Sequence, residues 1–272
     1  MTKEEKSVAL ISRSGKAPAD CQVAYRRLAS KVSVHKADIT DLRQLRSIVQ
    51  LFEEKKEKKE SKEKSKEKSK EKGKESGSGS GKETLKTLKG VVHAAGLLDD
   101  HMVKDLTEQQ MLSVLAPKAS GTLNLHKATE NCKDLDFFAL FSSVAALLGT
   151  PAQANYCAAN SFMDSFCSWM RQNGRSAVSI QWGPWAEIGM AARAKTSETS
   201  IGRISSAKAL QIFADLVASQ NLYPVAAVAF IKWDQLLKQL PSVPPLLSNF
   251  APKKQVSAAT YTLEDEHFIS LH

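Results

Sequence analysis

The chain has 272 residues, a formal net charge of +9 and 42% hydrophobic residues. This composition predicts one large or two small domains with a sizeable core, and it excludes a disordered protein, a collagen and a disulfide mini-protein. No apolar run is long enough to span a bilayer and no signal peptide is apparent, so we expect a cytoplasmic protein without a membrane partner.

Along the chain, short apolar runs alternate with longer amphipathic stretches. The expected strands are Val8–Ser12, Val32–Val34, Gly90–Ala94, Asp136–Phe141, Ala177–Gln181 and Val225–Phe230. The expected helices pass through Ala24–Ser30, Leu42–Phe52 after a cap at Asp41, Met111–Leu123, Gln153–Arg171 and Ala207–Val217. Strands separated by such helices form parallel βαβ units, so the pattern predicts an α/β fold with a doubly wound parallel sheet.

A charged, low-complexity run, residues 53–84, interrupts this pattern. Residues 53–75 contain 11 Lys, 8 Glu and no apolar side chain, and residues 76–81 read SGSGSG. Because nothing in this run can pack on a core, we expect a disordered insertion. A lysine-rich arm for nucleic acid is the alternative, but interleaved Glu residues cancel much of its field and it has no aromatic platform for bases. We expect no nucleic-acid partner.

The cysteines give no sign of a special chemistry. They are scattered without CxxC or metal-ligand spacing, which predicts small buried hydrophobic side chains in a reducing compartment and no bound metal. They are Cys21, Cys132, Cys157 and Cys167.

Candidate chemistry lies where the strands end, because ligands of doubly wound sheets bind beyond the carboxyl ends of the strands. Tyr156 and Asn160 are four residues apart and share one helix face, and Ser143 closes the preceding strand. A phenol tuned by a cation and hydrogen bonds could protonate a carbonyl oxygen while a hydride reaches the carbon. Taken singly, a helical Tyr is more commonly a packing residue and a serine pair a turn feature.

Longer motifs resemble a known family. The stretches LFSSVAALLGTPAQANYCAANSFMDSF and SIQWGPWAEIGMA are similar to the ketoreductase domain of type I polyketide and fatty acid synthases, within the short-chain dehydrogenase/reductase superfamily. The resemblance begins at LISRSG, continues through ADITD and GVVHAAGLLDD, and extends to about Pro245. It implies a Rossmann-like fold and NADPH-dependent reduction of a 3-oxoacyl thioester, carried on the phosphopantetheine arm of an acyl carrier protein domain, to the 3-hydroxyacyl thioester. Neighbouring synthase domains are the other implied partners.

The resemblance also implies catalytic roles. Tyr156 matches the proton donor, and Ser143 matches the hydroxyl that orients the substrate carbonyl. Asn160 stands where ordinary short-chain dehydrogenases carry the Lys of YxxxK, and Lys118 matches the Lys that this branch takes from the preceding helix. A cation near Tyr156 would lower the cost of tyrosinate, and Asn160 could support a proton relay. Without the family context, Lys118 would be a surface helix lysine.

For the cofactor, Arg13 matches the position that pairs with the adenosine 2′-phosphate, which implies NADPH rather than NADH. The alternative is a solvated loop arginine. Asp38 matches the carboxylate that binds the adenine amino group, although an Asp in such a turn is also an ordinary cap. The other implied cofactor contacts are Ala94, Ala95 and Gly96 on the ribose and nicotinamide side, and Gly183 and Pro184 near the carboxamide.

Two further segments bear on the substrate. Leu98, Asp99 and Asp100 resemble the LDD motif of ketoreductases that give the D-configured 3-hydroxy product, and Leu148 replaces the tryptophan expected in the opposite class. Met190–Ser206 would form a mobile lid over the substrate arm, although as plain sequence it is a polar loop.

One family feature has no counterpart in the sequence. The glycine-rich GxGxxG turn that binds pyrophosphate, and the first strand before it, would precede Val8, and no such motif occurs elsewhere. The loss of a central strand would leave unpaired strand edges. The alternative function is therefore a catalytically silent structural fragment of a multienzyme, and a nucleic-acid adaptor is a third. We expect a truncated domain in 1–52, its remainder with the catalytic residues and lid in 85–250, and a linker in 251–272.

Overall fold

The computed structural model describes residues 7–17, 22–52, 88–193, 200–218 and 223–251. The chain divides into two compact units. Unit 1 comprises Met1–Val91 and Ala116–Phe137, and unit 2 comprises Val92–Leu115 and Phe138–His272. The predicted insertion, 53–84, and all but the first residue of the predicted linker, 251–272, lie outside the described residues.

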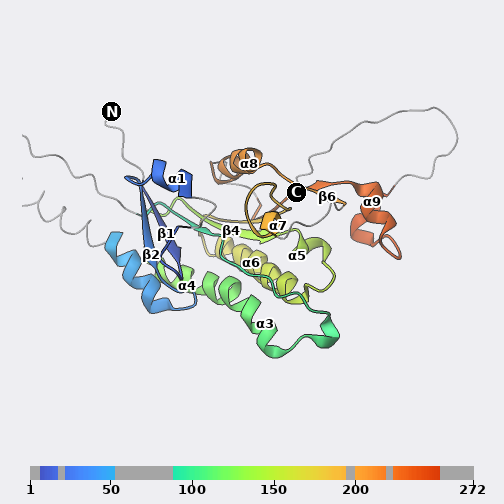
Figure 1. The fold of residues 1–272 in the computed structure, drawn as a ribbon, viewed down its shortest axis with the longest axis horizontal. Helices are drawn as coiled ribbons and strands as arrows, with labels where there is room; N and C mark the ends of the chain where they lie inside the picture. The colour runs from blue at the N-terminus through green and yellow to red at the C-terminus, as the bar shows by residue number, and fades with distance from the viewer. Residues whose placement is uncertain (1–6, 18–21, 53–87, 194–199, 219–222, 252–272) are drawn as a thin grey trace, which may run out of the picture. The chain divides into compact units, whose positions relative to one another are not determined.

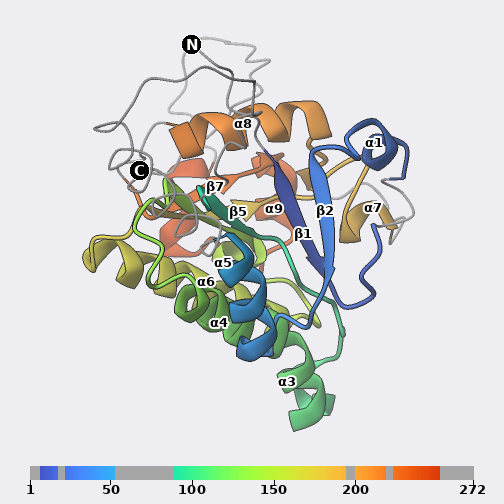
Figure 2. The ribbon, with the colours of Figure 1, turned by 90° about the vertical axis from the view of Figure 1, so that its left-hand side faces the viewer.

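Unit 1 contains a parallel pair of strands, β1 (Val8–Ser12) and β2 (Val32–Lys36), in register from Val8 opposite Val32 to Ser12 opposite Lys36. Figure 2 shows the two strands side by side. Helix α1 (Gln22–Arg27) lies between them in the chain, and residues 42–52 form the next helix. The predicted cap of that helix is confirmed, because Asp41 Oδ1 accepts the Arg43 N–H at 2.9 Å and the Gln44 N–H at 3.3 Å.

The single helix predicted through Met111–Leu123 is observed as three successive elements. They are α3 (Glu108–Leu115), a π-helical turn η3 (Ala116–Ser120) and α4 (Gly121–Ala128). Pro117 lies in this turn and has no N–H for an α-helical hydrogen bond, so the wider turn accommodates it. Within unit 1, α4 is fixed to the segment after β2, because Asn124 Nδ2 donates to the Ile39 carbonyl at 3.1 Å.

The larger sheet has the strand order β3 (Gly90–His93), β4 (Phe137–Ser143), β5 (Ala177–Trp182) and β7 (Val225–Val228). Strands β4, β5 and β7 run parallel, and every residue of β5 is buried. Strands of parallel sheets are covered on both faces, which is why their sequences are continuous apolar runs. These parallel strands, alternating with helices, confirm the predicted α/β fold class.

Helix α6 (Ala154–Gln172) is the longest element of unit 2 and packs against β5 (Figure 1). Asp164, on its buried face, accepts the Ser179 hydroxyl at 2.5 Å and the Gln181 side-chain N–H at 2.8 Å. Both donors belong to β5, so this carboxylate joins the helix to the sheet. Besides α3, the shorter helices of unit 2 before β7 are η2 (Val103–Asp105), α5 (Ala145–Leu148), α7 (Met190–Arg193) and α8 (Ser206–Ala218) among the described residues.

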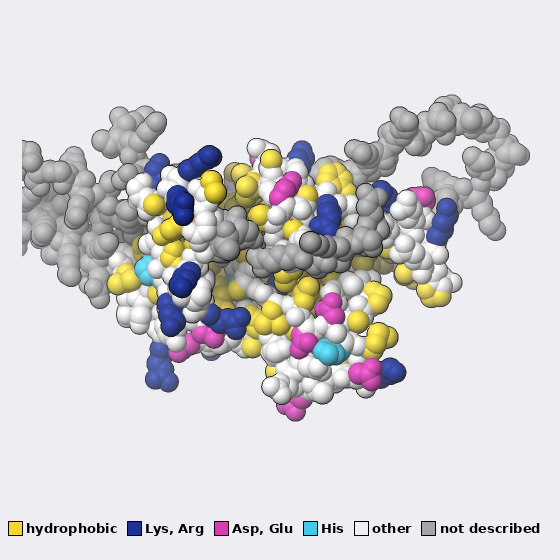
Figure 3. Space-filling model, in the orientation of Figure 1, with side chains coloured by type: hydrophobic (Ala, Val, Ile, Leu, Met, Phe, Trp, Pro, Cys, Tyr) yellow, Lys and Arg dark blue, Asp and Glu magenta, His cyan; other side chains and the backbone are white. Residues whose placement is uncertain are grey.

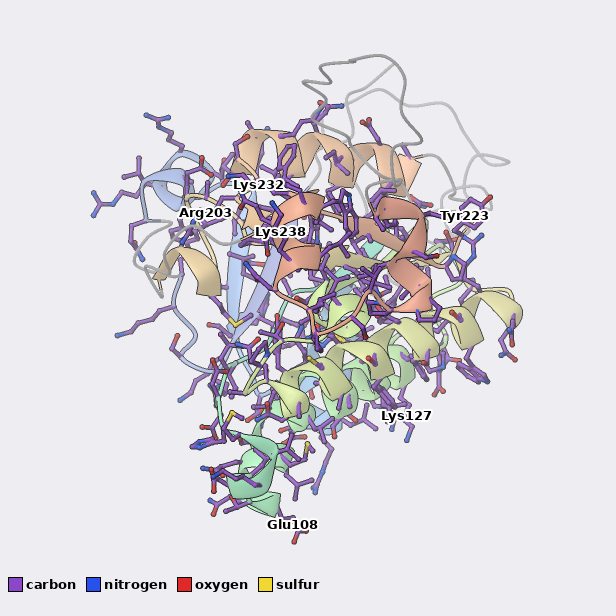
Figure 4. The ribbon with its side chains drawn as sticks, turned by 90° about the vertical axis from the view of Figure 1, so that its right-hand side faces the viewer. Glu108, Lys127, Arg203, Tyr223, Lys232 and Lys238 are labelled. Atoms are coloured by element: carbon purple, nitrogen blue, oxygen red, sulfur yellow. The ribbon has the colours of Figure 1, made fainter. Side chains whose placement is uncertain are left out.

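The C-terminal part of unit 2 differs from the prediction of one strand over Val225–Phe230. Strand β7 ends at Val228, and Phe230 belongs to β8 (Phe230–Ile231), which pairs antiparallel with β6 (Ile201–Gly202). Helix α9 (Trp233–Lys238) and the turn η4 (Pro245–Phe250) follow, joined by the Trp233 and Phe250 rings, whose centroids are 4.0 Å apart. Figure 4 labels Arg203, Lys232 and Lys238 in this part of the unit.

We expect Asp164→Leu to lower the free energy of unfolding by about 2–4 kcal/mol, because it leaves two buried donors of β5 without their acceptor. Urea unfolding followed by circular dichroism would measure the change. The matched control is Asp215→Leu, which removes an exposed carboxylate bonded to Gln211 at 3.1 Å. The control should change stability by less than about 0.5 kcal/mol. Equal losses in the two variants would contradict the role given to Asp164.

Candidate active site

Tyr156 lies in the first turn of α6 and is buried, with 8% of its surface exposed. It belongs to a buried apolar cluster with Val114, Ala145 and Ala159, and Leu98 packs against this cluster from the segment that follows β3. The phenol therefore lies in unit 2, among apolar side chains contributed by several elements of that unit.

Two polar side chains of unit 2 interact with the Tyr156 phenol. Burial raises the pKa of Tyr156, and hydrogen bonds with the Ser143 and Asn160 side chains offset part of that rise. Ser143 is the last residue of β4, and its Oγ also accepts the Ala145 N–H at 3.2 Å. The structure thus brings Ser143, Tyr156 and Asn160 together, as their positions in the sequence suggest.

Asn160 is bonded at one end of its side chain only. Its Nδ2 donates to the Tyr156 backbone carbonyl at 2.7 Å, one helical turn earlier. The Asn160 backbone carbonyl accepts the Ser142 hydroxyl at 3.4 Å. Its Oδ1 is buried and has no hydrogen-bond partner among the described residues. A buried acceptor without a partner is unfavourable for folding, so this oxygen could accept a hydrogen bond from a bound group.

The segment Leu98–His101 lies against the start of α6. The His101 N–H donates to the Ala152 carbonyl at 2.8 Å, and Gln153 Nε2 donates to Asp100 Oδ2 at 2.9 Å. Asn155 Nδ2 donates to the Asp99 carbonyl at 2.8 Å. The sequence predicted a role for Asp99 and Asp100 but not their hydrogen-bond partners. The only signal for these partners was the presence of two side-chain amides, Gln153 and Asn155, just before Tyr156.

The remaining predicted residues of unit 2 lie after β3 and β5. Ala94, Ala95 and Gly96 follow β3, with Ala94 and Gly96 exposed. Gly183 is buried, its N–H donates to the Val228 carbonyl at 2.8 Å, and an added Cβ would lie 3.1 Å from the Ala229 Cβ. A side chain at Gly183 would therefore press on the chain after β7. Pro184 follows it, and Leu148 ends α5.

The ends of the predicted lid, Met190–Ser206, are partly described. The Ile204 N–H donates to the Pro184 carbonyl, and the Ala186 N–H donates to the Ile204 carbonyl, both at 2.8 Å. Glu187 accepts the Ser206 N–H and hydroxyl at 2.7 and 2.6 Å, and these bonds lower the pKa of Glu187. The two ends are thus joined, while residues 194–199 lie outside the described residues.

Arg13 and Asp38 lie in unit 1, just after β1 and β2. Asp38 Oδ1 accepts the Thr40 N–H at 2.9 Å and the Thr40 hydroxyl at 2.7 Å. These two bonds lower the pKa of Asp38, and the positive charge of Arg13 contributes to the shift. The Asp38 carboxylate therefore forms the turn that its position alone suggests, while Arg13 is exposed.

Lys118 also belongs to unit 1, in the π-helical turn η3. Its side chain is buried, and its carbonyl accepts the Thr122 hydroxyl at 2.6 Å. It is therefore not the surface helix lysine that its position alone would suggest.

The described part of unit 1 before residue 53 is rich in positive charge. Figure 3 shows dark-blue Lys and Arg side chains on this part of the surface, with few acidic ones between them. A positive surface favours an anionic ligand. The basic residues in this part are Arg13, Lys16, Arg26, Arg27, Lys31, Lys36, Arg43 and Arg46.

Comparison with known proteins identifies relatives of this chain. Residues 70–187 match the family model described as the KR domain. The chain is 37% identical, over 156 residues, to a phenolphthiocerol/phthiocerol polyketide synthase of Mycobacterium tuberculosis, covering 57% of this chain and 8% of that protein. It is 36% identical to a 6-methylsalicylic acid synthase of Arthrobotrys oligospora over 183 residues, covering 64% of this chain and 10% of that protein.

Solved structures agree with this assignment. A ketoreductase domain from the bacillaene assembly line matches with a TM-score of 0.65 and 28% identity, over 88% of this chain and 53% of its own. The ketoreductase of the first module of phoslactomycin biosynthesis in Streptomyces sp. HK803 has the same fold, with a TM-score of 0.73 at 24% identity, over 91% of this chain and 52% of its own. These comparisons support a KR domain in this chain, which the family model matches over residues 70–187.

The KR domain is an oxidoreductase domain of polyketide synthases, and its family binds nicotinamide cofactors. The chain spans a tenth or less of these two curated relatives and about half of these two structural neighbours. Among the described residues, no group of His, Cys, Asp and Glu is arranged to hold a metal ion. The described helices also include none with the length and apolar character of a membrane span.

We expect the Tyr156 phenol to titrate above the ordinary range of a phenol in an alkaline titration. Burial disfavours the charged phenolate, so Tyr156 should ionise above the ordinary value of about 10. The pKa of Tyr156 is higher in the folded state than in the unfolded state. The folding stability linked to the protonated phenol is therefore fully present below the unfolded-state pKa, and it is lost as the pH rises through the folded-state pKa. Phenolate absorbance would follow the transition, which Tyr156→Phe should remove and Tyr223→Phe should leave. A late transition that survives Tyr156→Phe would refute this assignment.

Proposed function

We propose that this KR domain reduces a 3-oxoacyl thioester, carried on the phosphopantetheine arm of an acyl carrier protein domain, to the 3-hydroxyacyl thioester with NADPH. The observation that carries the proposal is the buried Tyr156 phenol, which is hydrogen-bonded to Ser143 in the KR domain. A neutral phenol in an apolar surrounding keeps its proton at neutral pH and can donate it to an oxygen that becomes negatively charged.

In this proposal, each residue of the constellation has one task. Ser143 donates a hydrogen bond to the substrate ketone and orients it. Tyr156 gives its proton to the ketone oxygen, while the nicotinamide, when bound, supplies the hydride to the carbon. The products are the alcohol and NADP⁺, and Tyr156 must regain a proton from solvent. The available Oδ1 of Asn160 suits a water molecule on that path, and Lys118 would favour the transient tyrosinate by its charge.

In this proposal, different residues of the chain bind the two ends of NADPH. The exposed guanidinium of Arg13 suits the adenosine 2′-phosphate, and Asp38 beside it suits the adenine amino group. Gly183, where an added Cβ would lie 3.1 Å from the Ala229 Cβ, would place its backbone near the carboxamide. The other proposed contacts are Pro184 near the carboxamide, and Ala94, Ala95 and Gly96 near the ribose and nicotinamide.

Two segments would act on the acyl chain. We propose that Leu98, Asp99 and Asp100 favour the D-configured product and that Met190–Ser206 covers the substrate arm. Neighbouring synthase domains would deliver the acyl carrier protein. The proposed division of the chain is a KR domain in 1–52 and 85–250, an insertion in 53–84, and a linker in 251–272.

We expect Tyr156→Phe to lower the rate of thioester reduction by at least about a hundredfold, because it removes the proton donor. The measurement is NADPH oxidation with a 3-oxoacyl N-acetylcysteamine thioester. NADPH binding, followed by fluorescence, should change by less than about twofold, because the phenyl ring keeps the packing. Tyr223→Phe, which changes a more exposed tyrosine, is the control and should keep full activity. Full activity in Tyr156→Phe would exclude the proposed role.

Arg13→Ala should raise the KM for NADPH by about tenfold or more and leave the KM for NADH nearly unchanged, because only NADPH carries the 2′-phosphate. Steady-state kinetics with the two cofactors would measure the ratio. Arg26→Ala, in α1, removes an equal charge from unit 1 and serves as the control. A similar change in both variants would indicate a general field effect and not a specific pair.

The second candidate function is a catalytically silent structural part of a multienzyme. It differs from the first in that it needs no turn to supply backbone donors for pyrophosphate. In that case, the unaltered chain binds no NADPH and reduces no thioester, and a form extended upstream through a glycine-rich strand and turn is equally inert.

A further inference from the structure

Trp182 is the last residue of β5, and only 5% of its surface is exposed. Its indole Nε1 is buried and has no hydrogen-bond partner among the described residues. An indole nitrogen can only donate a hydrogen bond, so its proton needs an acceptor. A buried donor without an acceptor is unfavourable for folding, and a phenyl ring would fill the same place without that cost. Packing alone therefore does not explain an indole here.

The indole belongs to an aromatic cluster that joins three elements of unit 2. Between ring centroids, Phe141 of β4 lies 5.6 Å from Trp182 and 5.6 Å from Phe213 of α8. The Trp185 ring, in the segment after β5, packs edge-on against Trp182 at 5.2 Å. None of these three rings carries an acceptor oxygen or nitrogen, so they pack around the indole without satisfying its N–H.

Trp182 also lies beside the candidate active site. It pairs with Ser143 in the register of β4 and β5, and the Val144 N–H donates to its carbonyl at 3.1 Å. Neighbouring strands are about 4.8 Å apart, so the backbones of the paired residues are adjacent. The preceding side chain, Gln181, bonds to α6. Because side chains of a strand alternate between the faces of a sheet, the indole extends from the opposite face, whereas Tyr156 belongs to α6.

We propose that Trp182 contacts the cofactor and that its indole N–H donates a hydrogen bond to the carboxamide oxygen of the nicotinamide. The inference rests on the proposed function and names a further binding residue for it. Hydride transfer needs the nicotinamide C4 within about 3–3.5 Å of the ketone carbon beside Ser143 and Tyr156. The carboxamide is bonded to C3, the neighbouring ring atom, so it must lie close to the same strand ends. The nicotinamide would then lie between the phenol and the indole.

The buried position of this donor sets a condition on binding. The Nε1 atom is not open to solvent, so a neighbouring side chain must shift before a carboxamide can reach it. Trp185 is half-buried and directly follows Gly183 and Pro184, the two proposed neighbours of the carboxamide. Its ring is therefore the one that we expect to move, and such side-chain changes at a binding site are common. The resulting bond is shielded from water, where a hydrogen bond is stronger.

The experiment compares the dissociation constants of NADPH and thio-NADPH, in which a sulfur atom replaces the carboxamide oxygen and is a weaker acceptor. Isothermal titration calorimetry measures both without any turnover. The variant is Trp182→Phe, which removes the N–H and keeps an aromatic ring. One control, Trp185→Phe, removes an indole from the same cluster, and the other, Trp169→Phe, removes an indole that is 45% exposed on α6.

We expect the unaltered chain to bind NADPH about fivefold or more tightly than thio-NADPH, because one buried hydrogen bond distinguishes the two cofactors. Trp182→Phe should weaken NADPH binding by a similar factor and change thio-NADPH binding by less than about twofold, which removes the preference. Both controls should keep the preference. Equal weakening for the two cofactors in Trp182→Phe would show a packing role only and would overturn the proposal.

A measurement on the unaltered chain decides the question if Trp182→Phe does not fold. The chain has four tryptophans, and their indole N–H groups give separate signals in a nitrogen–proton NMR spectrum. The variants Trp169→Phe, Trp185→Phe and Trp233→Phe identify the Trp182 signal by elimination. Saturating NADPH should shift that signal to lower field, and thio-NADPH should shift it less. A Trp182 signal that stays in place with NADPH would overturn the proposal.

The two proposals fail in different ways. If the unaltered chain binds no NADPH, the proposed function fails and this inference fails with it. If the unaltered chain binds NADPH and reduces the thioester, but Trp182→Phe keeps the full preference for NADPH over thio-NADPH, only the role given to Trp182 fails.

Discussion

The interaction between the Tyr156 hydroxyl and the Ser143 side chain is the one on which the candidate active site depends. Its two partners come from different elements, the start of α6 and the end of β4. The contact persists only if the helix cannot slide or rotate on the sheet. Two bonds prevent that movement, from Ser142 to the Asn160 carbonyl and from Ser179 to Asp164. Because both are buried in unit 2, they stabilise the geometry without a contribution from water.

The buried polar side chains along α6 differ in how many of their polar atoms have hydrogen-bond partners. This difference distinguishes the side chains that stabilise the fold from the one that could serve the reaction. Asn155 and Asp164 use their polar atoms in bonds to backbone or to neighbouring side chains. Asn160 keeps its Oδ1 without a partner among the described residues. Such an oxygen destabilises the fold by about 1–3 kcal/mol, so stability alone does not explain an amide there. Its place one turn after the phenol is consistent with a water-mediated path for protons.

The sequence predicted what depends on residue type and missed what depends on backbone atoms. The strand Val8–Ser12 was predicted with its observed ends, because a continuous apolar run between polar flanks marks it clearly. The meeting of Ser143, Tyr156 and Asn160 followed from strand-end and i,i+4 spacing. The π-helical turn at Pro117 was missed, because the apolar period continues through it. The bond from Asn155 to the Asp99 carbonyl was also missed, since a carbonyl acceptor leaves no trace in the choice of residue.

The two units contain different residues of the proposed reaction. The hydrogen bonds described above for Ser143, Asn160 and the segment Leu98–His101 join residues of unit 2. Arg13 and Asp38 belong to unit 1, where β1 pairs only with β2 among the described residues.

The exposure of β1 is unusual for its type of sheet. Val8, Leu10 and Ile11 expose 53%, 38% and 38% of their surfaces, whereas strands of parallel sheets are normally covered on both faces. These three side chains of β1 are thus only partly covered in the described part of unit 1.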